Sequence, residues 1–136
     1  MNFEVLEHTA DIGVRAWGST QQEMMANAGL AMVGIAMDLD EISEREAYPI
    51  AARGEDLESL LVNWLNEVLY YLDGRRIGLR RIEVQRCSTE EAAGIGWGEP
   101  RTEKHQANLV VKGVTYHQLK VEHRAGRWQC EVYLDI

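Results

Sequence analysis

The clearest pattern in the chain is an apolar stripe of helical period between residues 57 and 72. Its members advance by alternating steps of three and one: Leu57, Leu60, Leu61, Trp64, Leu65, Val68, Leu69 and Leu72. That spacing winds one broad apolar face along a helix. Gly74 follows and supplies a stop. We expect this helix to lie in the core.

A second helix is predicted after Gly18. Thr20 and Glu23 have the spacing of a capping box. Apolar residues then recur at intervals typical of a helix face: Met24, Ala28, Ala31, Met32 and Ile35. Because this helix is rich in alanine and methionine, we expect it to pack closely against its neighbours.

Alternating apolar and polar residues predict strands elsewhere in the chain. These segments are 2–7, 12–17, 48–52, 77–87, 95–99, 114–122 and 128–134. Pro49 places its strand at a sheet edge, because proline cannot donate to the ladder. In the last strand the period of two puts Asp135 on the face opposite the apolar residues. The pattern does not assign residues 102–111.

Strands that flank two helices, followed mostly by strands, indicate an α+β protein. We expect one domain over residues 1–136, in two layers, with a mixed β-sheet packed against two main helices. With 136 residues, 46% of them apolar, the chain can bury a core without metal or disulfide staples.

The net charge and the cysteine content limit the classes of function that the protein can have. A formal charge of -8 argues against stable nucleic-acid binding by the protein alone, and suits a basic protein partner or a bound cation. Cys87 and Cys130 lie far apart and outside any C-x-x-C pattern, so we interpret them as buried thiols in a reducing compartment. The chain lacks a signal-peptide pattern and a membrane-spanning apolar run, which predicts a cytoplasmic protein.

Candidate metal ligands lie near both ends of the chain. Asp135 adjoins the carboxylate of Ile136 at the end of a predicted strand, and Asp11 closes the run Glu7–Asp11. Three carboxylates brought together by the terminal strands would repel one another unless a cation or Lys112 compensated them. Oxygen ligands favour calcium or magnesium over zinc. Calcium needs about six to eight oxygens, so water or a partner's group would complete the site.

Other polar patterns are weaker. Asp38–Glu41 lacks the glycine and spacing of an EF-hand and fits a solvated loop. Gly94–Glu99 has no lysine-serine pair after it, which favours a bulged strand over a phosphate loop.

His117 and His123 would share a face of an unbroken strand, but without a third soft ligand zinc is disfavoured. Lys112, in an apolar run, either extends to the surface or neutralises the carboxylates.

The sequence resembles the archease family in five ordered blocks that span about Glu4 to Ile136. The blocks are Glu7–Ala16, Leu60–Glu67, Gly98–Glu99, Lys112–His117 and Asp135–Ile136. The resemblance implies a small metal-binding protein that assists the RtcB-type RNA ligase, which joins tRNA exon halves using GTP. Archeases promote guanylylation of the ligase histidine and multiple turnover.

The resemblance also implies individual residue roles. By motif position, the calcium ligands would be Asp11 and Asp135 together with a main-chain or terminal oxygen of Ile136. Lys112 would be the functional lysine. One departure is Gly113, where the family usually has alanine, which loosens the backbone beside Lys112.

We therefore expect a non-catalytic activator that presents a carboxylate-bound metal to an RNA ligase during tRNA splicing. One alternative is an independent metal-dependent phosphohydrolase, although the sequence offers no convincing base near the acids. The other is a chaperone-like modulator of RNA-modifying enzymes such as RNA methyltransferases.

Overall fold

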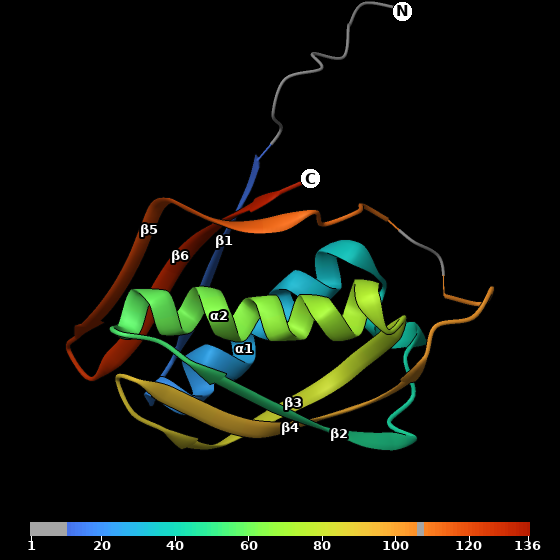
Figure 1. Cartoon of the computed structure of the whole chain (residues 1–136), viewed down its shortest axis with the longest axis horizontal. Coiled ribbons are helices and arrows are strands. Elements are labelled where there is room, and N and C mark those ends of the chain that lie inside the picture. The colour runs from blue at the N-terminus through green and yellow to red at the C-terminus, as the bar shows by residue number, and fades with distance from the viewer. Residues whose placement is uncertain (1–10, 106–107) are drawn as a thin grey trace, which may run out of the picture.

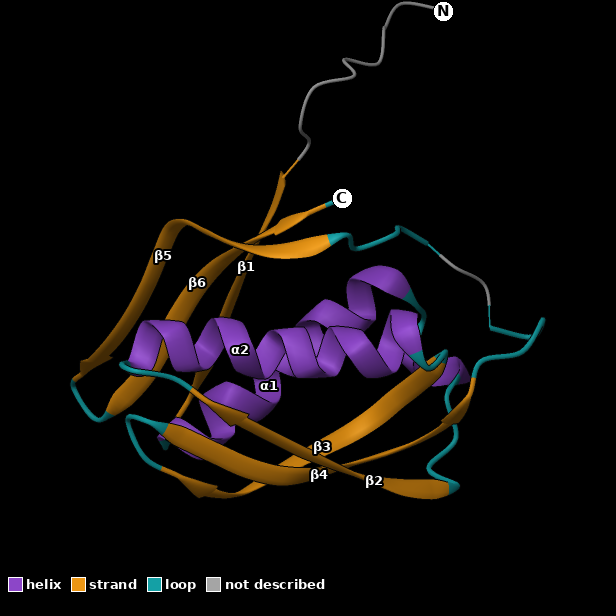
Figure 2. Cartoon of the chain, viewed as in Figure 1, coloured by secondary structure: helices purple, strands orange, loops and turns teal. Residues whose placement is uncertain are grey.

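Two helices lie between two three-stranded antiparallel sheets in this computed structural model (Figure 1), which describes residues 11–105 and 108–136. The first sheet has the order β1 (Asp11–Gly18), β6 (Arg127–Asp135), β5 (Gly113–Arg124). The second has the order β2 (Glu46–Arg53), β4 (Glu91–Pro100), β3 (Ile77–Cys87). The helices contact strands of both sheets, and Figure 2 shows the long loop that joins the sheets between β4 and β5.

Both predicted helices are present. In α1 (Gln21–Ala36) the Thr20 hydroxyl accepts the amide of Glu23 at 3.1 Å, while the Glu23 carboxylate accepts the amide of Ser19 at 2.8 Å. The helix α2 (Leu57–Leu69) continues into one π-helical turn, η2 (Tyr70–Gly74), so the predicted stop at Gly74 is confirmed. A short 3-10 helix, η1 (Leu39–Glu41), follows α1.

The apolar stripe of α2 forms the centre of the core, as predicted. Leu57 and Leu69 are half-buried, and the other members of the stripe are buried: Leu60, Leu61, Trp64, Leu65, Val68 and Leu72. Trp64 links the two helices, because its indole Nε1 donates to the main-chain oxygen of Met25 at 3.0 Å. Indole nitrogens usually need such a partner when they are buried.

The α+β class is confirmed, but the predicted two layers with a single mixed sheet are wrong. The described strands form two separate sheets in which every pair is antiparallel, and the helices fill the space between them. Alternation identifies which face of a strand is buried, but it does not identify the neighbouring strand. The predicted edge position of the strand around Pro49 is confirmed, since β2 ends its sheet. The predicted strand 2–7 lies outside the described residues.

Glycines in β4 are explained by its close approach to β3. A Cβ atom at Gly98 would lie 1.7 Å from the main-chain oxygen of Gly78, and one at Gly94 would lie 2.2 Å from that of Glu83. The register of β3 shifts near both contacts, as expected for bulges. The irregular-strand interpretation is therefore confirmed, and the strand extends over Glu91–Pro100 instead of 95–99.

The cysteine prediction holds for one residue. Cys130 is buried and Cys87 is half-buried, and both are free thiols. Within the described ranges, none of the helices is long and apolar enough to cross a membrane.

Candidate functional site

The first and last described strands bring the two predicted metal-binding acids together. In the antiparallel pairing of β1 with β6, Asp11 stands directly opposite Asp135. Directly paired residues point to the same face, with Cβ atoms about 4.5–5.5 Å apart. Asp11 is exposed and Asp135 is half-buried. The strand ends that carry them lie side by side near the C-terminus in Figure 1.

The main chain at Lys112 adjoins the same strand end. Its amide donates to the main-chain oxygen of Asp135 at 2.7 Å, and the next residue, Gly113, pairs with Asp135 in the sheet. Val111 is buried, so the backbone before the exposed Lys112 is anchored in the core. A Cβ atom at Gly113 would meet nothing within 4 Å, so an alanine there would fit. We call Asp11, Lys112, Asp135 and Ile136 the strand-end cluster.

The charged side chains of the strand-end cluster form no ion pairs within the described residues. Neither Asp11 nor Asp135 forms an ion pair with a Lys, Arg or His of residues 11–105 and 108–136, and the Lys112 ammonium forms none either. Like charges directly opposite each other destabilise a strand pair. A hard divalent cation would offset this repulsion, and carboxylate oxygens are the ligands it prefers.

The cluster supplies only part of a coordination shell. Across the parts of the chain that the structure describes, no three His, Cys, Asp or Glu side chains gather in a metal-binding group. Two aspartates and one oxygen of the half-buried Ile136 would fill only some of the coordination positions of a calcium ion. Water or groups of a partner would fill the others. Because Asp11 is exposed, such a site would be accessible from solvent.

The histidines of β5 do not form a pair. The β5–β6 register shifts between Thr115 and Lys120, which breaks the regular alternation. His117 lies edge-on to Tyr133 at 6.0 Å, whereas His123 stacks on Trp128 at 4.3 Å. Because Tyr133 and Trp128 belong to opposite faces of β6, the two histidines lie on opposite faces of the sheet.

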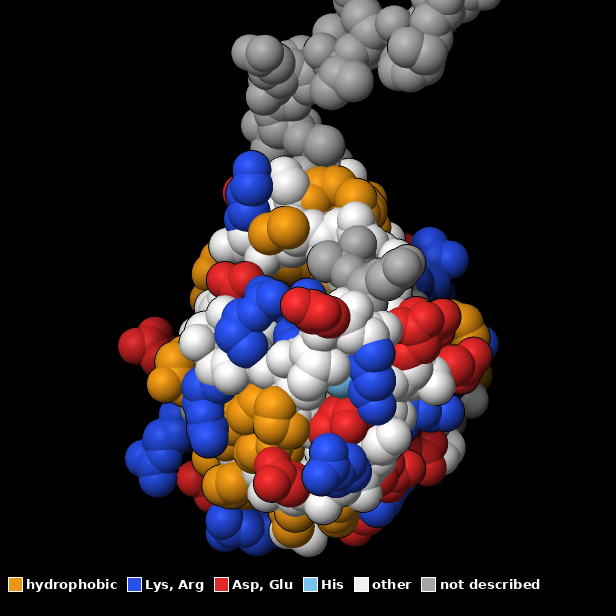
Figure 3. Space-filling model, turned by 90° about the vertical axis from the view of Figure 1, so that its right-hand side faces the viewer, with side chains coloured by type: hydrophobic (Ala, Val, Ile, Leu, Met, Phe, Trp, Pro, Cys, Tyr) orange, Lys and Arg blue, Asp and Glu red, His pale blue; other side chains and the backbone are white. Residues whose placement is uncertain are grey.

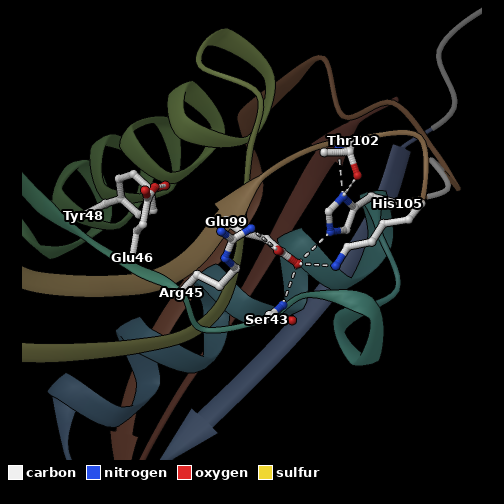
Figure 4. Close-up of polar contacts among 8 residues, drawn as sticks. Ser43, Arg45, Glu46, Tyr48, Glu99, Thr102 and His105 are labelled. Atoms are coloured by element: carbon white, nitrogen blue, oxygen red, sulfur yellow. Dashed lines mark hydrogen bonds and ion pairs between the residues drawn. The ribbon is translucent and has the colours of Figure 1, made fainter.

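A buried carboxylate lies at the other end of the β4–β5 loop (Figure 4). The side chain of Glu99 is 3% exposed and accepts the amide of Ser43 at 2.8 Å and the Nε2 proton of His105 at 2.9 Å. Lys104 Nζ lies 3.2 Å away and Arg45 Nη1 lies 3.8 Å away. These hydrogen bonds stabilise the ionised carboxylate and lower the pKa of Glu99 from 4.5 to about 2. The bond from the Ser43 amide has the largest effect, and the bond from His105 has the next largest.

The hydrogen bonds fix the proton on His105. The amide of Thr102 donates to Nδ1 at 2.8 Å, and an amide nitrogen can only donate, so Nδ1 carries a lone pair and Nε2 carries the proton. The Thr102 hydroxyl lies 3.3 Å from the same Nδ1. Since the Thr102 amide already occupies that lone pair, His105 is not free to activate the hydroxyl as a base. The network therefore tethers the β4–β5 loop to the segment at Ser43.

Sequence reasoning missed this network. Glu99 was noted only as part of the Gly98–Glu99 block of the family resemblance. His105 belongs to residues 102–111, which the sequence pattern did not assign. Figure 3 shows this side of the molecule, where acidic and basic side chains are interspersed over the surface. No local pattern distinguishes Glu99 from the many surface acids, because its partners come from a distant main-chain amide and a turn.

The fold and the strand-end cluster together define a small α+β protein that carries an open carboxylate pair. The chain belongs to the archease family, since the model of the Archease protein family matches residues 3–136. Protein archease of Methanosarcina mazei is 37% identical over 139 residues, which cover 98% of this chain and 95% of that protein. The Drosophila melanogaster protein archease-like is 32% identical over 142 residues, with coverage of 100% and 91%.

Solved structures agree with this assignment. The solution structure of Methanobacterium thermoautotrophicum protein 1598 has a TM-score of 0.77 and 28% identity, and the match covers 98% of this chain and 96% of that one. The crystal structure of a Thermotoga maritima archease, described as a possible chaperone, has a TM-score of 0.71, with coverage of 100% and 98%. At 20% identity the second match supports the fold alone. The predicted family is thus confirmed.

Proposed function

We propose that this archease-family protein is a non-catalytic activator of an RtcB-type RNA ligase in tRNA splicing. In this role it promotes guanylylation of the ligase histidine and multiple turnover. The observation that supports the proposal most strongly is the direct pairing of Asp11 with Asp135, with the amide of Lys112 bonded to the Asp135 carbonyl. The three residues come from distant parts of the sequence and meet at one exposed strand end.

The two aspartates are proposed to hold a divalent cation, calcium first and magnesium as the alternative. Ile136 would add a main-chain or terminal oxygen. A bound divalent cation supplies positive charge that stabilises phosphoryl transfer. The contribution of this chain is to fix the acids by antiparallel pairing and to leave the outer side of the site open to the ligase.

Lys112 is proposed to act on the ligase or its nucleotide. Its backbone is held between the buried Val111 and the Asp135 carbonyl, while its side chain is exposed. A fixed backbone with an exposed ammonium suits contact with an anionic group across an interface. The net charge of -8 suits docking against a basic surface around the ligase active site.

A multiple-turnover ligation assay with the cognate ligase tests this function. Adding the wild-type protein should raise the number of RNA joins per ligase, and Asp11→Ala or Asp135→Ala should abolish the increase. Asp40→Ala, which removes an exposed aspartate of η1, is the matched control and should activate fully. Circular dichroism should show that all three variants stay folded. Full activation by both strand-end variants would contradict the proposal.

The same assay separates the two rival functions. An independent phosphohydrolase would release phosphate from nucleotides or RNA without any ligase. A chaperone role, which the description of the Thermotoga maritima protein suggests, would survive metal chelation. Our proposal requires that chelation abolishes activation and that no phosphate is released without ligase.

A further inference from the structure

A cavity of about 230 Å³ lies between the end of α2 and the segment that leads to Lys112. Its apolar walls include Leu72 on the side of η2 and Val111 on the side of the β4–β5 loop. Three charged residues also line it: Arg76, Arg101 and Asp73. Because Val111 directly precedes Lys112, one wall of the cavity belongs to the segment that carries the strand-end lysine.

Arg101 is held in place, and one of its side-chain donors is buried without a partner among the described residues. Its main-chain amide donates to the oxygen of Arg76 at 2.7 Å, and its Nη1 donates to the oxygen of Leu72 at 3.1 Å. Its Nε is buried from solvent and makes no hydrogen bond within the described residues. Buried donors in proteins are nearly always paired, so this Nε is an unsatisfied donor in a side chain that lines the cavity.

The local charge also favours an anion. The pKa of Arg101 is lowered, mainly by burial and to a smaller extent by the nearby positive charge of Arg76. The negative charge of Asp73 acts in the opposite direction. Two arginines and one aspartate leave this cavity with a net positive charge, in a chain whose overall charge is -8. Ordinary surface arginines would keep their donors in water, whereas here one donor is excluded from it.

We propose that Arg101 and Arg76 form a binding site for a phosphate group, supplied by a nucleotide or by an RNA end. A planar guanidinium carries its Nε and Nη donors in a fork that matches an oxyanion, and a phosphate that bonds to the Arg101 Nε has to displace the groups that now cover this atom. The Leu72 contact orients the Arg101 fork, and Arg76 adds a second cation. Phosphate binding here does not depend on the ligase-activator role, so the site can be tested on the protein alone.

Titration with inorganic phosphate, followed by NMR of the arginine Nε–H groups and backbone amides, tests the site. At constant ionic strength, with chloride as the reference anion, the signals of Arg101, Arg76 and Val111 should shift saturably. Arg101→Lys, which keeps the charge but loses the fork, should weaken binding about tenfold or more, because hydrogen bonds to charged groups are lost. Arg76→Gln should weaken it similarly.

Asp73→Asn gives the opposite expectation. Removing the competing carboxylate should tighten phosphate binding, which a purely structural role for these residues does not predict. Arg53→Gln, at an exposed arginine elsewhere, is the control and should leave binding unchanged. Shifts no larger with phosphate than with chloride would overturn the proposal, and so would an unchanged affinity in both Arg101→Lys and Arg76→Gln.

Two further titrations identify the source of the phosphate. GTP and an RNA oligonucleotide with a terminal phosphate are compared with guanosine and the same oligonucleotide without that phosphate. The proposal predicts that only the phosphorylated member of each pair shifts the Arg101 signal. Equal shifts by both members of each pair would contradict it.

Discussion

Replacing Glu99 by glutamine should destabilise the protein in a pH-dependent way. The pKa of Glu99 falls from its ordinary 4.5 to about 2, and at about 1.36 kcal/mol per pH unit this corresponds to about 3 kcal/mol in favour of the ionised form. Lys104 is 57% exposed and Arg45 is 72% exposed, so solvent screens part of the interaction. We therefore expect Glu99→Gln to lose about 1–2 kcal/mol at pH 7.

The sign of the pH dependence follows from the lowered pKa. A carboxylate whose folded pKa lies below its unfolded value contributes its full stabilisation above the unfolded pKa and loses it as the pH falls through the folded one. For Glu99 that window runs from 4.5 down to about 2. The stability difference between wild type and Glu99→Gln should thus be largest at neutral pH and shrink across this window.

Urea unfolding at neutral pH and at several acidic values measures the difference. Glu103→Gln removes an exposed glutamate from the same loop and serves as the control, with an expected change within about 0.5 kcal/mol. A Glu99→Gln variant as stable as wild type at pH 7 would refute the reasoning. So would a stability difference that stays constant down to pH 2.

Two further predictions concern packing and thiol chemistry. Gly98→Ala should cost several kcal/mol in thermal or urea unfolding, on the order of 3, because its Cβ would clash with the Gly78 oxygen, whereas Gly113→Ala should be near neutral. Burial raises the pKa of Cys130 to about 11, so alkylation at pH 8, mapped by mass spectrometry, should modify the half-buried Cys87 first. Faster modification of Cys130 in the folded protein would contradict the described packing.

Local signals predicted the elements well where one physical cause dominated. The helical spacing from Leu57 to Leu72 identified α2 and its buried face, and Thr20 identified the start of α1. Alternation in β6 correctly placed Asp135 away from the core. In each case the residues that carry the signal lie within a few turns or one strand, so no knowledge of tertiary contacts is needed.

Features that depend on distant contacts were missed or predicted wrongly. The division into two antiparallel sheets depends on which strands pair, and a hydrophobic pattern specifies only the buried face. Glu99 is bound by a main-chain amide at Ser43, which no side-chain pattern can indicate. The cavity at Arg101 likewise forms only when the loop before Lys112 packs beside η2.

Calorimetric titration with calcium tests the central claim most directly, because it asks whether the paired acids of β1 and β6 hold an ion. The wild-type protein should bind calcium with heat that saturates at one ion per chain. Asp11→Ala and Asp135→Ala should each abolish that heat, while Asp40→Ala should bind like wild type. Calcium binding of unchanged affinity and stoichiometry in both strand-end variants would contradict the account.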